Sequence, residues 1–115
     1  GRMHFLGQVE HEKLPQFYKA AKVHILASWM ETPGLSSLEA AVMNTNIVVT
    51  KKGDTEDYFK DYAFYCEPDD LDSIRKAVVA AYETPFTEGM KERILQNYKW
   101  ENTAEETLQG YKSVL

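Results

Sequence analysis

Two glutamates eight positions apart are the strongest candidates in this sequence for binding a ligand. Glu31 precedes a Pro-Gly pair, and Glu39 closes the run Glu31-Thr-Pro-Gly-Leu-Ser-Ser-Leu-Glu39. A carboxylate in a turn can accept hydrogen bonds from ligand hydroxyls, and loop residues on a rigid scaffold often bind ligands. Between them, Gly34 would let backbone N–H groups approach a phosphate, because helix N-termini attract anions.

Apolar runs on both sides of this segment indicate the strands and the helix around the two carboxylates. Residues 23–27 and 47–50 have the composition of buried strands, and residues 35–43 have the one-face apolar spacing of a helix. The segment is therefore predicted to run strand, glycine turn, helix, strand. Ligands of open α/β sheets bind outside the carboxyl ends of the strands, which is where Glu31 is expected.

Strand and helix patterns alternate through the rest of the chain and predict a parallel α/β sheet. Further strands are expected at residues 4–6 and 63–66, and further helices at 14–21, 55–59, 71–82, 87–96 and 100–114. Asp70 is expected to cap the helix after it, and Asn44 to end the helix before it in a left-handed conformation. Periodicity predicts inward-facing side chains at Leu35, Leu71, Trp100 and Tyr111.

Composition narrows the class of protein. The 115 residues, 43% hydrophobic and 27% charged, suffice for one small domain. A net charge of -5 argues against a nucleic-acid surface, and no apolar run approaches the ~20 residues of a membrane span. The lone Cys66 gives no sign of an oxidising compartment. We expect a cytoplasmic location, with a membrane-peripheral parent protein as the alternative.

Each candidate residue also has a purely structural explanation. Ser36 and Glu39 form a capping-box pattern, so on spacing alone Glu39 more often caps its own helix than binds a ligand. Gly34 could simply supply the positive φ of a tight turn. Trp29 could stack on a base or sugar, although packing is the commoner role at a strand end. His24 is expected in the core or at a sheet edge.

Other kinds of chemistry have less support in the sequence. The three histidines show no metal-ligand spacing, and Cys66 is expected to be a small buried hydrophobe. We find no Ser/His/Asp or Cys/His arrangement, so catalysis through a protein nucleophile is unsupported.

Taken together, the motifs resemble the GT-B retaining glycosyltransferases of the family 4-like kind, known as glycosyl transferases group 1. Within that fold, the chain resembles the branch that includes sucrose-phosphate synthases and many bacterial mannosyl- and glucosyltransferases. Besides the Glu31-x7-Glu39 pair, the resemblance is carried by Phe5-Leu-Gly-Gln-Val9, Leu14-Pro-Gln-Phe-Tyr18, Ala20-Ala-Lys-Val-His-Ile-Leu-Ala-Ser28, Gly53-Asp-Thr-Glu-Asp-Tyr-Phe59, Tyr65-Cys-Glu-Pro-Asp69 and Trp100-Glu-Asn-Thr-Ala104. In this order the motifs cover nearly the whole chain.

The resemblance implies that residues 1–115 are the C-terminal portion of a nucleotide-sugar-binding, Rossmann-like domain. The enzyme would move a sugar from a nucleotide-diphosphate donor to an acceptor with retention, using no metal or cofactor. In the family, the glutamate matching Glu31 contacts the transferred sugar and is taken as catalytic, and the one matching Glu39 holds the ribose. The resemblance places the remaining donor contacts at the N–H groups of Gly34, Leu35 and Ser36, facing the diphosphate, and at Gln8 and Val9, by the base.

The chain also departs from the family pattern. The usual E-G-F-G-L is Glu31-Thr-Pro-Gly-Leu35 here, so Thr32 and Pro33 should stiffen the turn. The family's acceptor domain is missing, as are the first two donor-domain strands with the basic residues that neutralise the diphosphate. We therefore expect a cut chain that is inactive alone, with an open seam between its first and second strands that favours self-association.

Two alternatives remain open at this stage. One is a GT-B epimerase or phosphorylase, which would share the fold. The other is a non-enzymatic α/β regulatory or interaction module. A receiver-like module is disfavoured because no predicted strand ends in an Asp pair.

Overall fold

The computed structural model describes residues 2–32 and 34–115 and shows an α/β fold. Its strands are β1 (Val23–Leu26), β2 (Asn46–Thr50) and β3 (Phe64–Cys66). Its helices, in chain order, are η1 (His11–Lys13), α1 (Leu14–Ala20), α2 (Leu35–Val42), α3 (Thr55–Phe59), η2 (Lys60–Tyr62), α4 (Leu71–Glu83), α5 (Glu88–Asn97) and α6 (Trp100–Val114). The η elements are short 3₁₀ helices.

The three strands form the parallel sheet that the sequence predicts, in the order β1-β2-β3. Val23 lies opposite Asn46, and Thr50 lies opposite Cys66. All residues of the central strand β2 are buried, as expected for a parallel strand covered on both faces. Parallel alignment brings the carboxyl ends of all three strands to one edge of the sheet.

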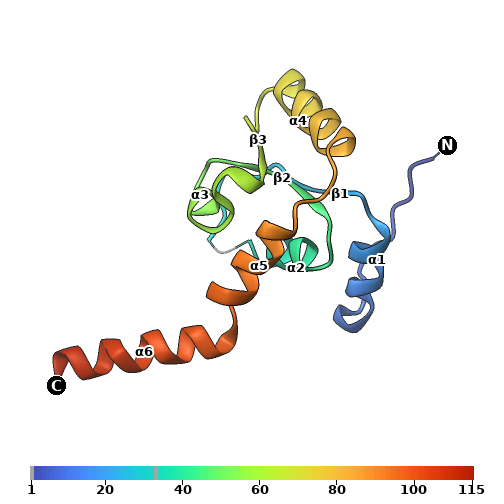
Figure 1. Ribbon diagram of the computed structural model, residues 1–115. Helices are drawn as coiled ribbons and strands as arrows, with labels where there is room; N and C mark the ends of the chain where they lie inside the picture. The colour runs from blue at the N-terminus through green and yellow to red at the C-terminus, as the bar shows by residue number, and fades with distance from the viewer. Residues whose placement is uncertain (1, 33) are drawn as a thin grey trace.

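Helices cover both faces of this sheet (Figure 1). Ile47 and Val49 of β2 belong to the larger core cluster, which includes residues of α2 and α5. Val48 points to the opposite face and packs with Ala77 and Ala81 of α4. Because successive side chains of a strand alternate between faces, α2 and its Glu39 are fixed on the face opposite α4.

The cap predicted at Asp70 and the left-handed residue predicted at Asn44 are both confirmed. Asp70 caps α4, since its side chain accepts hydrogen bonds from the N–H groups of Asp72 and Ser73 at 2.9 and 3.1 Å. Asn44, just after α2, has a φ of 65°, the left-handed conformation that asparagine tolerates best after glycine.

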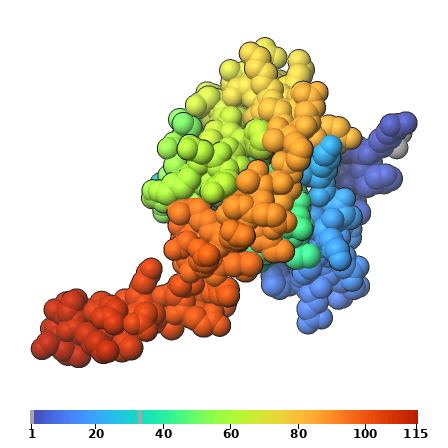
Figure 2. Space-filling view, in the orientation of Figure 1, coloured from blue at the N-terminus to red at the C-terminus, as the bar shows by residue number. Residues whose placement is uncertain are grey.

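Several predictions that apolar residues would pair or pack inside the fold are wrong. His4–Leu6 forms no strand, because no described strand lies beside it to share hydrogen bonds. Leu71 is 79% exposed although Ile74 and Val78 of the same helix pack against the core, and Leu35 is also exposed. Trp100 and Tyr111 dock nothing within the described chain, because α6 carries no buried residue. In Figures 1 and 2 this helix extends away from the body of the molecule.

The predicted open seam lies along β1. This strand pairs with β2 on one side, and within residues 2–32 and 34–115 nothing pairs with its other side. Ile25 in this strand remains 47% exposed. The described helices include none that is long and apolar enough to cross a membrane.

Candidate functional site

Glu31 lies just beyond the carboxyl end of β1, where its backbone is tied to the segment that follows β2. Its N–H donates to the carbonyl of Lys52 at 3.3 Å, and its carbonyl accepts from the N–H of Asp54 at 3.1 Å. These bonds form an isolated parallel bridge between Glu31 and Gly53. The sequence predicts a turn at Glu31, and in the structure this turn also continues the parallel pairing of β1 with β2 by one bridge.

Gly53 is required by this bridge. Its φ is +91°, and a Cβ at this position would overlap the carbonyl oxygen of Glu31. A side chain would thus meet both a backbone conformation that favours glycine and a clash with the main chain. The sequence predicts a turn at Gly53 but does not show that its partner is the candidate site residue.

The carboxylate of Glu31 is positioned as well. Its Oε1 accepts a hydrogen bond from the Ser28 hydroxyl at 2.7 Å, and the carbonyl of Ser28 accepts one from Thr50 Oγ1 at 2.7 Å. Oε2 of Glu31 lies 3.8 Å from the place that a Cβ on Gly34 would occupy. The structure thus brings the half-buried Glu31 side chain beside the N-terminus of α2.

This helix end carries no side-chain cap among the described residues. Gly34 is the N-cap, with a φ of -72°, so the predictions of a positive φ at Gly34 and of a Ser36–Glu39 capping box are both wrong. The first N–H groups of a helix cannot be satisfied within the helix. Leu35 and Ser36 therefore present N–H groups that no side chain caps. Pro33 lies outside the described residues.

Glu39 lies one turn further along α2 and is held by side chains from the elements before β1. Its Oε2 accepts from the hydroxyl of Tyr18 at 3.3 Å, and its Oε1 lies 3.2 Å from Nε2 of His11. Burial, followed by the charge and hydrogen bond of Glu39, raises the pKa of Tyr18 above its usual value. The phenol thus stays protonated and able to donate at neutral pH.

His24 completes the contacts behind this carboxylate. Its Nε2 lies 3.1 Å from the hydroxyl of the buried Ser37, and its ring meets that of Tyr18 edge-on, with 5.9 Å between centroids. Burial lowers the pKa of His24 below its usual value. The prediction of a sheet-edge histidine is confirmed, because β1 is an edge strand.

The other sequence candidates lie apart from this arrangement or differ from expectation. Gln8 is exposed and Val9 half-buried, in the segment before η1, and no described hydrogen bond joins either to Glu31. Trp29 is 66% exposed, so the packing role expected for it is wrong. Cys66 is buried as predicted, and burial raises the pKa of its thiol.

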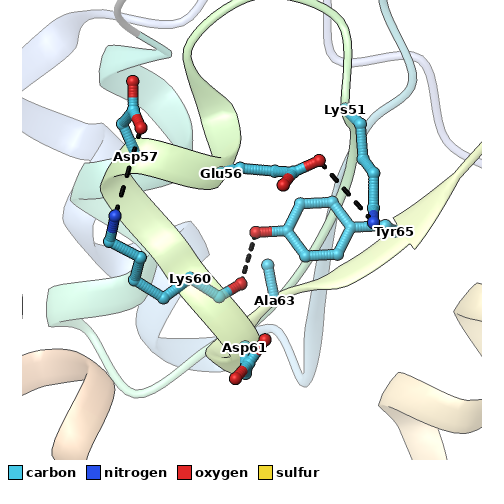
Figure 3. Close-up of a pocket in the computed structure, with 7 residues that line it drawn as sticks. All are labelled: Lys51, Glu56, Asp57, Lys60, Asp61, Ala63 and Tyr65. Carbon is cyan, nitrogen blue, oxygen red and sulfur yellow. Dashed lines mark hydrogen bonds and ion pairs between the residues drawn. The ribbon is translucent and has the colours of Figure 1, made fainter.

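A cavity of about 360 Å³ between β3 and α3 is a separate candidate (Figure 3). Its charged groups are largely paired with one another: Lys51 Nζ lies 3.6 Å from Glu56 Oε1, and Lys60 Nζ lies 4.0 Å from Asp57 Oδ1. The Tyr65 hydroxyl donates to the carbonyl of Lys60. Since these groups satisfy one another, the cavity offers less to a ligand than the open helix end beside Glu31.

The described residues contain no cluster of three or more His, Cys, Asp or Glu side chains arranged to hold a metal ion. The arrangement at α2 is instead suited to an uncharged hydroxyl-bearing ligand joined to an anion. A carboxylate accepts from hydroxyls, and helix N–H groups beside it attract phosphate oxygens.

The chain is similar to known glycosyltransferases in sequence and in structure. The family model of glycosyl transferases group 1 matches residues 1–100. Over 97% of its length the chain is 26% identical to the O-antigen chain mannosyltransferase B of Escherichia coli, and over 94% it is 30% identical to an uncharacterized glycosyltransferase of Methanocaldococcus jannaschii. It superimposes on a sucrose-phosphate synthase from Thermosynechococcus elongatus with a TM-score of 0.84 and 25% identity over 98% of its length.

The chain spans 30% of the length of each of these proteins. The match to the sucrose-phosphate synthase supports the prediction of a GT-B half-domain with a parallel sheet and flanking helices.

Proposed function

The chain belongs to the glycosyl transferases group 1 family, and we propose that it is the donor-binding part of a hexosyltransferase. The enzyme moves a sugar from a nucleotide-diphosphate sugar to an acceptor with retention of anomeric configuration. Because the chain matches only 30% of the length of each relative, we propose that it is part of a longer parent enzyme, in which a further domain holds the acceptor.

The observation that carries this proposal is the fixed position of Glu31 beside the uncapped N-terminus of α2. In a nucleotide-diphosphate sugar, the sugar hydroxyls and the diphosphate are separated by a few bonds. A ligand of this kind needs hydroxyl acceptors and phosphate-binding N–H groups side by side. Glu31 would supply the acceptors, and Gly34, Leu35 and Ser36 would supply the N–H groups.

Each residue then has a distinct task. Glu31 holds and orients the migrating sugar through its hydroxyls, and Ser28 fixes the rotamer of Glu31. Glu39 accepts hydrogen bonds from the ribose. Basic side chains outside residues 1–115 neutralise the diphosphate, and the proposed reaction uses no metal or cofactor.

The alternatives from the sequence are less well supported. Two of the three similar proteins, a mannosyltransferase and a sucrose-phosphate synthase, favour transfer over epimerisation or phosphorolysis. A purely structural or interaction module would not need a carboxylate held by Ser28 and tied through Gly53 next to an uncapped helix.

The experiment is steady-state kinetics of the Glu31→Gln variant of the parent enzyme. Hydrolysis of UDP-glucose and GDP-mannose is a suitable assay, because water replaces the acceptor. We expect kcat and kcat/KM to fall together by about tenfold or more, since a contact made to the migrating sugar strengthens in the transition state. Glu56→Gln, which removes an exposed acid paired with Lys51, is the matched control.

An unchanged kcat in Glu31→Gln would overturn the role of Glu31. The anomeric configuration of the released sugar, followed by NMR immediately after hydrolysis, tests retention. Residues 1–115 alone are expected to show no turnover, because the groups that hold the acceptor and neutralise the diphosphate lie outside them.

A further inference from the structure

We propose that Tyr18 is a positioning residue, which holds the Glu39 carboxylate in place for the ribose of the donor. This inference rests on the proposed function, because it presumes that Glu39 binds the ribose. It assigns a role to a helix, α1, whose residues the donor is not expected to touch.

The contact itself has the chemistry of a positioning bond. The Tyr18 hydroxyl donates a hydrogen bond to Oε2 of Glu39, and a carboxylate can accept further bonds at its remaining lone pairs. The distance of 3.3 Å is longer than the usual range for such a bond. Bonds of this kind often tighten when the ligand is bound.

Tyr18 is itself held from two sides. Its backbone carbonyl accepts a hydrogen bond at 2.6 Å from the hydroxyl of Thr45, a fully buried residue. Its ring packs against the larger core cluster and meets His24 edge-on. The backbone and the ring of Tyr18 therefore have little freedom, and its hydroxyl is held in place next to Glu39.

His11 contacts the same carboxylate but is a weaker support. Its side chain is 80% exposed, compared with 39% for Glu39. Ion pairs between exposed side chains contribute little, because water screens them and both side chains lose entropy. Of the two contacts, that of Tyr18 is the one able to restrict Glu39.

Restricting Glu39 matters for affinity because immobilising a flexible side chain on binding costs free energy. A carboxylate already fixed by Tyr18 avoids part of this cost, and it presents a defined oxygen to each ribose hydroxyl. The consequence is a preference for ribonucleotides over their deoxy counterparts, and this preference should depend on the tyrosine hydroxyl.

The test measures this preference in the parent enzyme. Isothermal titration calorimetry gives dissociation constants for UDP and GDP and for their 2′-deoxy and 3′-deoxy counterparts. In Tyr18→Phe we expect the ratio of deoxy to ribo dissociation constants to fall roughly three- to tenfold, the usual effect of one lost hydrogen bond. For hydrolysis of the sugar donor, we expect the KM for the donor to rise in Tyr18→Phe and the kcat, measured at saturating donor, to stay unchanged.

Tyr98→Phe is the matched control. Tyr98 is also half-buried, and its hydroxyl donates to the carbonyl of Asp57 at 3.1 Å, away from Glu39. This variant should lose stability but keep the ribose preference. The preference is a ratio within one variant, so a general loss of stability does not alter it. If Tyr18→Phe does not fold, Thr45→Val removes the hydrogen bond that holds the backbone of Tyr18 without touching Glu39, and it should lower the ratio in the same direction.

The outcomes separate the two ideas. If Glu39→Gln loses the ribose preference but Tyr18→Phe keeps it, the positioning role of Tyr18 is overturned and the role of Glu39 stands. If Tyr98→Phe lowers the preference as much as Tyr18→Phe, the role of Tyr18 is again overturned. If Glu39→Gln keeps the preference, the ribose role of Glu39 fails, and the role of Tyr18 fails with it.

Discussion

The two glutamates are fixed by different parts of the chain. Glu31 is held largely through its backbone, which bridges to Gly53, and through a neighbour three residues away, Ser28. Glu39 is held by side chains that lie 21 and 28 positions earlier in the sequence. Only the Ser28 contact is local in sequence. The bridge to Gly53 and the contacts of Glu39 both depend on how distant segments of the chain pack together.

The glycines illustrate where residue-level prediction stops. Sequence reasoning assigns the special conformation to Gly34, but its φ is -72°. The conformation and the close contact that require glycine both occur at Gly53. A turn signal in the sequence predicts where glycine is favoured. It does not predict which backbone segment packs against that glycine, because this depends on how distant segments pair.

His24 gives a pH-dependent prediction. Burial lowers its pKa in the folded state, so the unfolded chain binds more protons in the interval below its usual pKa of about 6.5. The stability that the neutral imidazole contributes is therefore fully present above about pH 6.5 and is lost as the pH falls toward the folded-state pKa. Urea unfolding of the dilute chain between about pH 7.5 and about pH 5 measures this loss.

The control is His24→Gln, which keeps a polar group near Ser37 but does not titrate. The carboxylates of the chain titrate in both proteins, so the difference between the two pH profiles isolates His24. We expect the variant to lose less stability on acidification than the wild type. Profiles of equal slope would contradict a neutral, half-buried His24.

Among the elements, those with partners inside the chain are the ones predicted well. The signals for β1, β2, β3 and for the helices from α2 to α5 combine local periodicity with caps and breakers, and the structure confirms these elements. The segment at residues 4–6 and the inner face of α6 have the same kind of apolar pattern. An apolar pattern predicts that a face tends to be buried, but it does not predict which segment or partner covers that face.

Arg93 joins two elements whose contact the sequence does not reveal. Its guanidinium donates to the carbonyls of Tyr58 and Asp57 at 3.0 and 2.8 Å and lies 3.2 Å from the hydroxyl of Tyr98. These bonds link α5 to α3, the helix that follows the bridge at Gly53. Arg93 thus supports the segment that holds the backbone of Glu31.

Arg93→Lys should lower the free energy of unfolding by about 1–2 kcal/mol, because a lysine cannot reproduce the planar arrangement of donors. Arg75→Lys is the matched control, since Arg75 is 75% exposed and pairs with Asp72 at 3.5 Å. Its replacement should change stability by less than about 0.5 kcal/mol. Equal effects in thermal or urea unfolding would show that the α3–α5 link contributes little.

At the scale of the whole molecule, apolar groups remain exposed in two protruding segments. Figure 2 shows α6 extending from one side of the body and the N-terminal segment from the other. Phe5 is 92% exposed and Trp100 is 85% exposed. These two segments and the unpaired edge of β1 are the parts of the described chain that leave apolar side chains or backbone hydrogen-bonding groups exposed.

The edge of β1 should make residues 1–115 self-associate. Its unpaired N–H and C=O groups can pair with another copy, and the half-exposed Ile25 adds apolar area beside them. We expect light scattering to show a mass that rises with concentration. Ile25→Lys should reduce this association, because a lysine on an edge strand opposes pairing.

Val79→Lys is the matched control for this last prediction. Val79 on α4 is 48% exposed, almost the same as Ile25 at 47%, and both substitutions move the net charge of -5 by one unit toward zero. A smaller net charge weakens the repulsion between copies, so a charge effect alone would increase association in both variants. Reduced association in Ile25→Lys alone would therefore identify the β1 edge as the contact. A wild-type chain that stays monomeric at high concentration, or an equal response in the two variants, would contradict it.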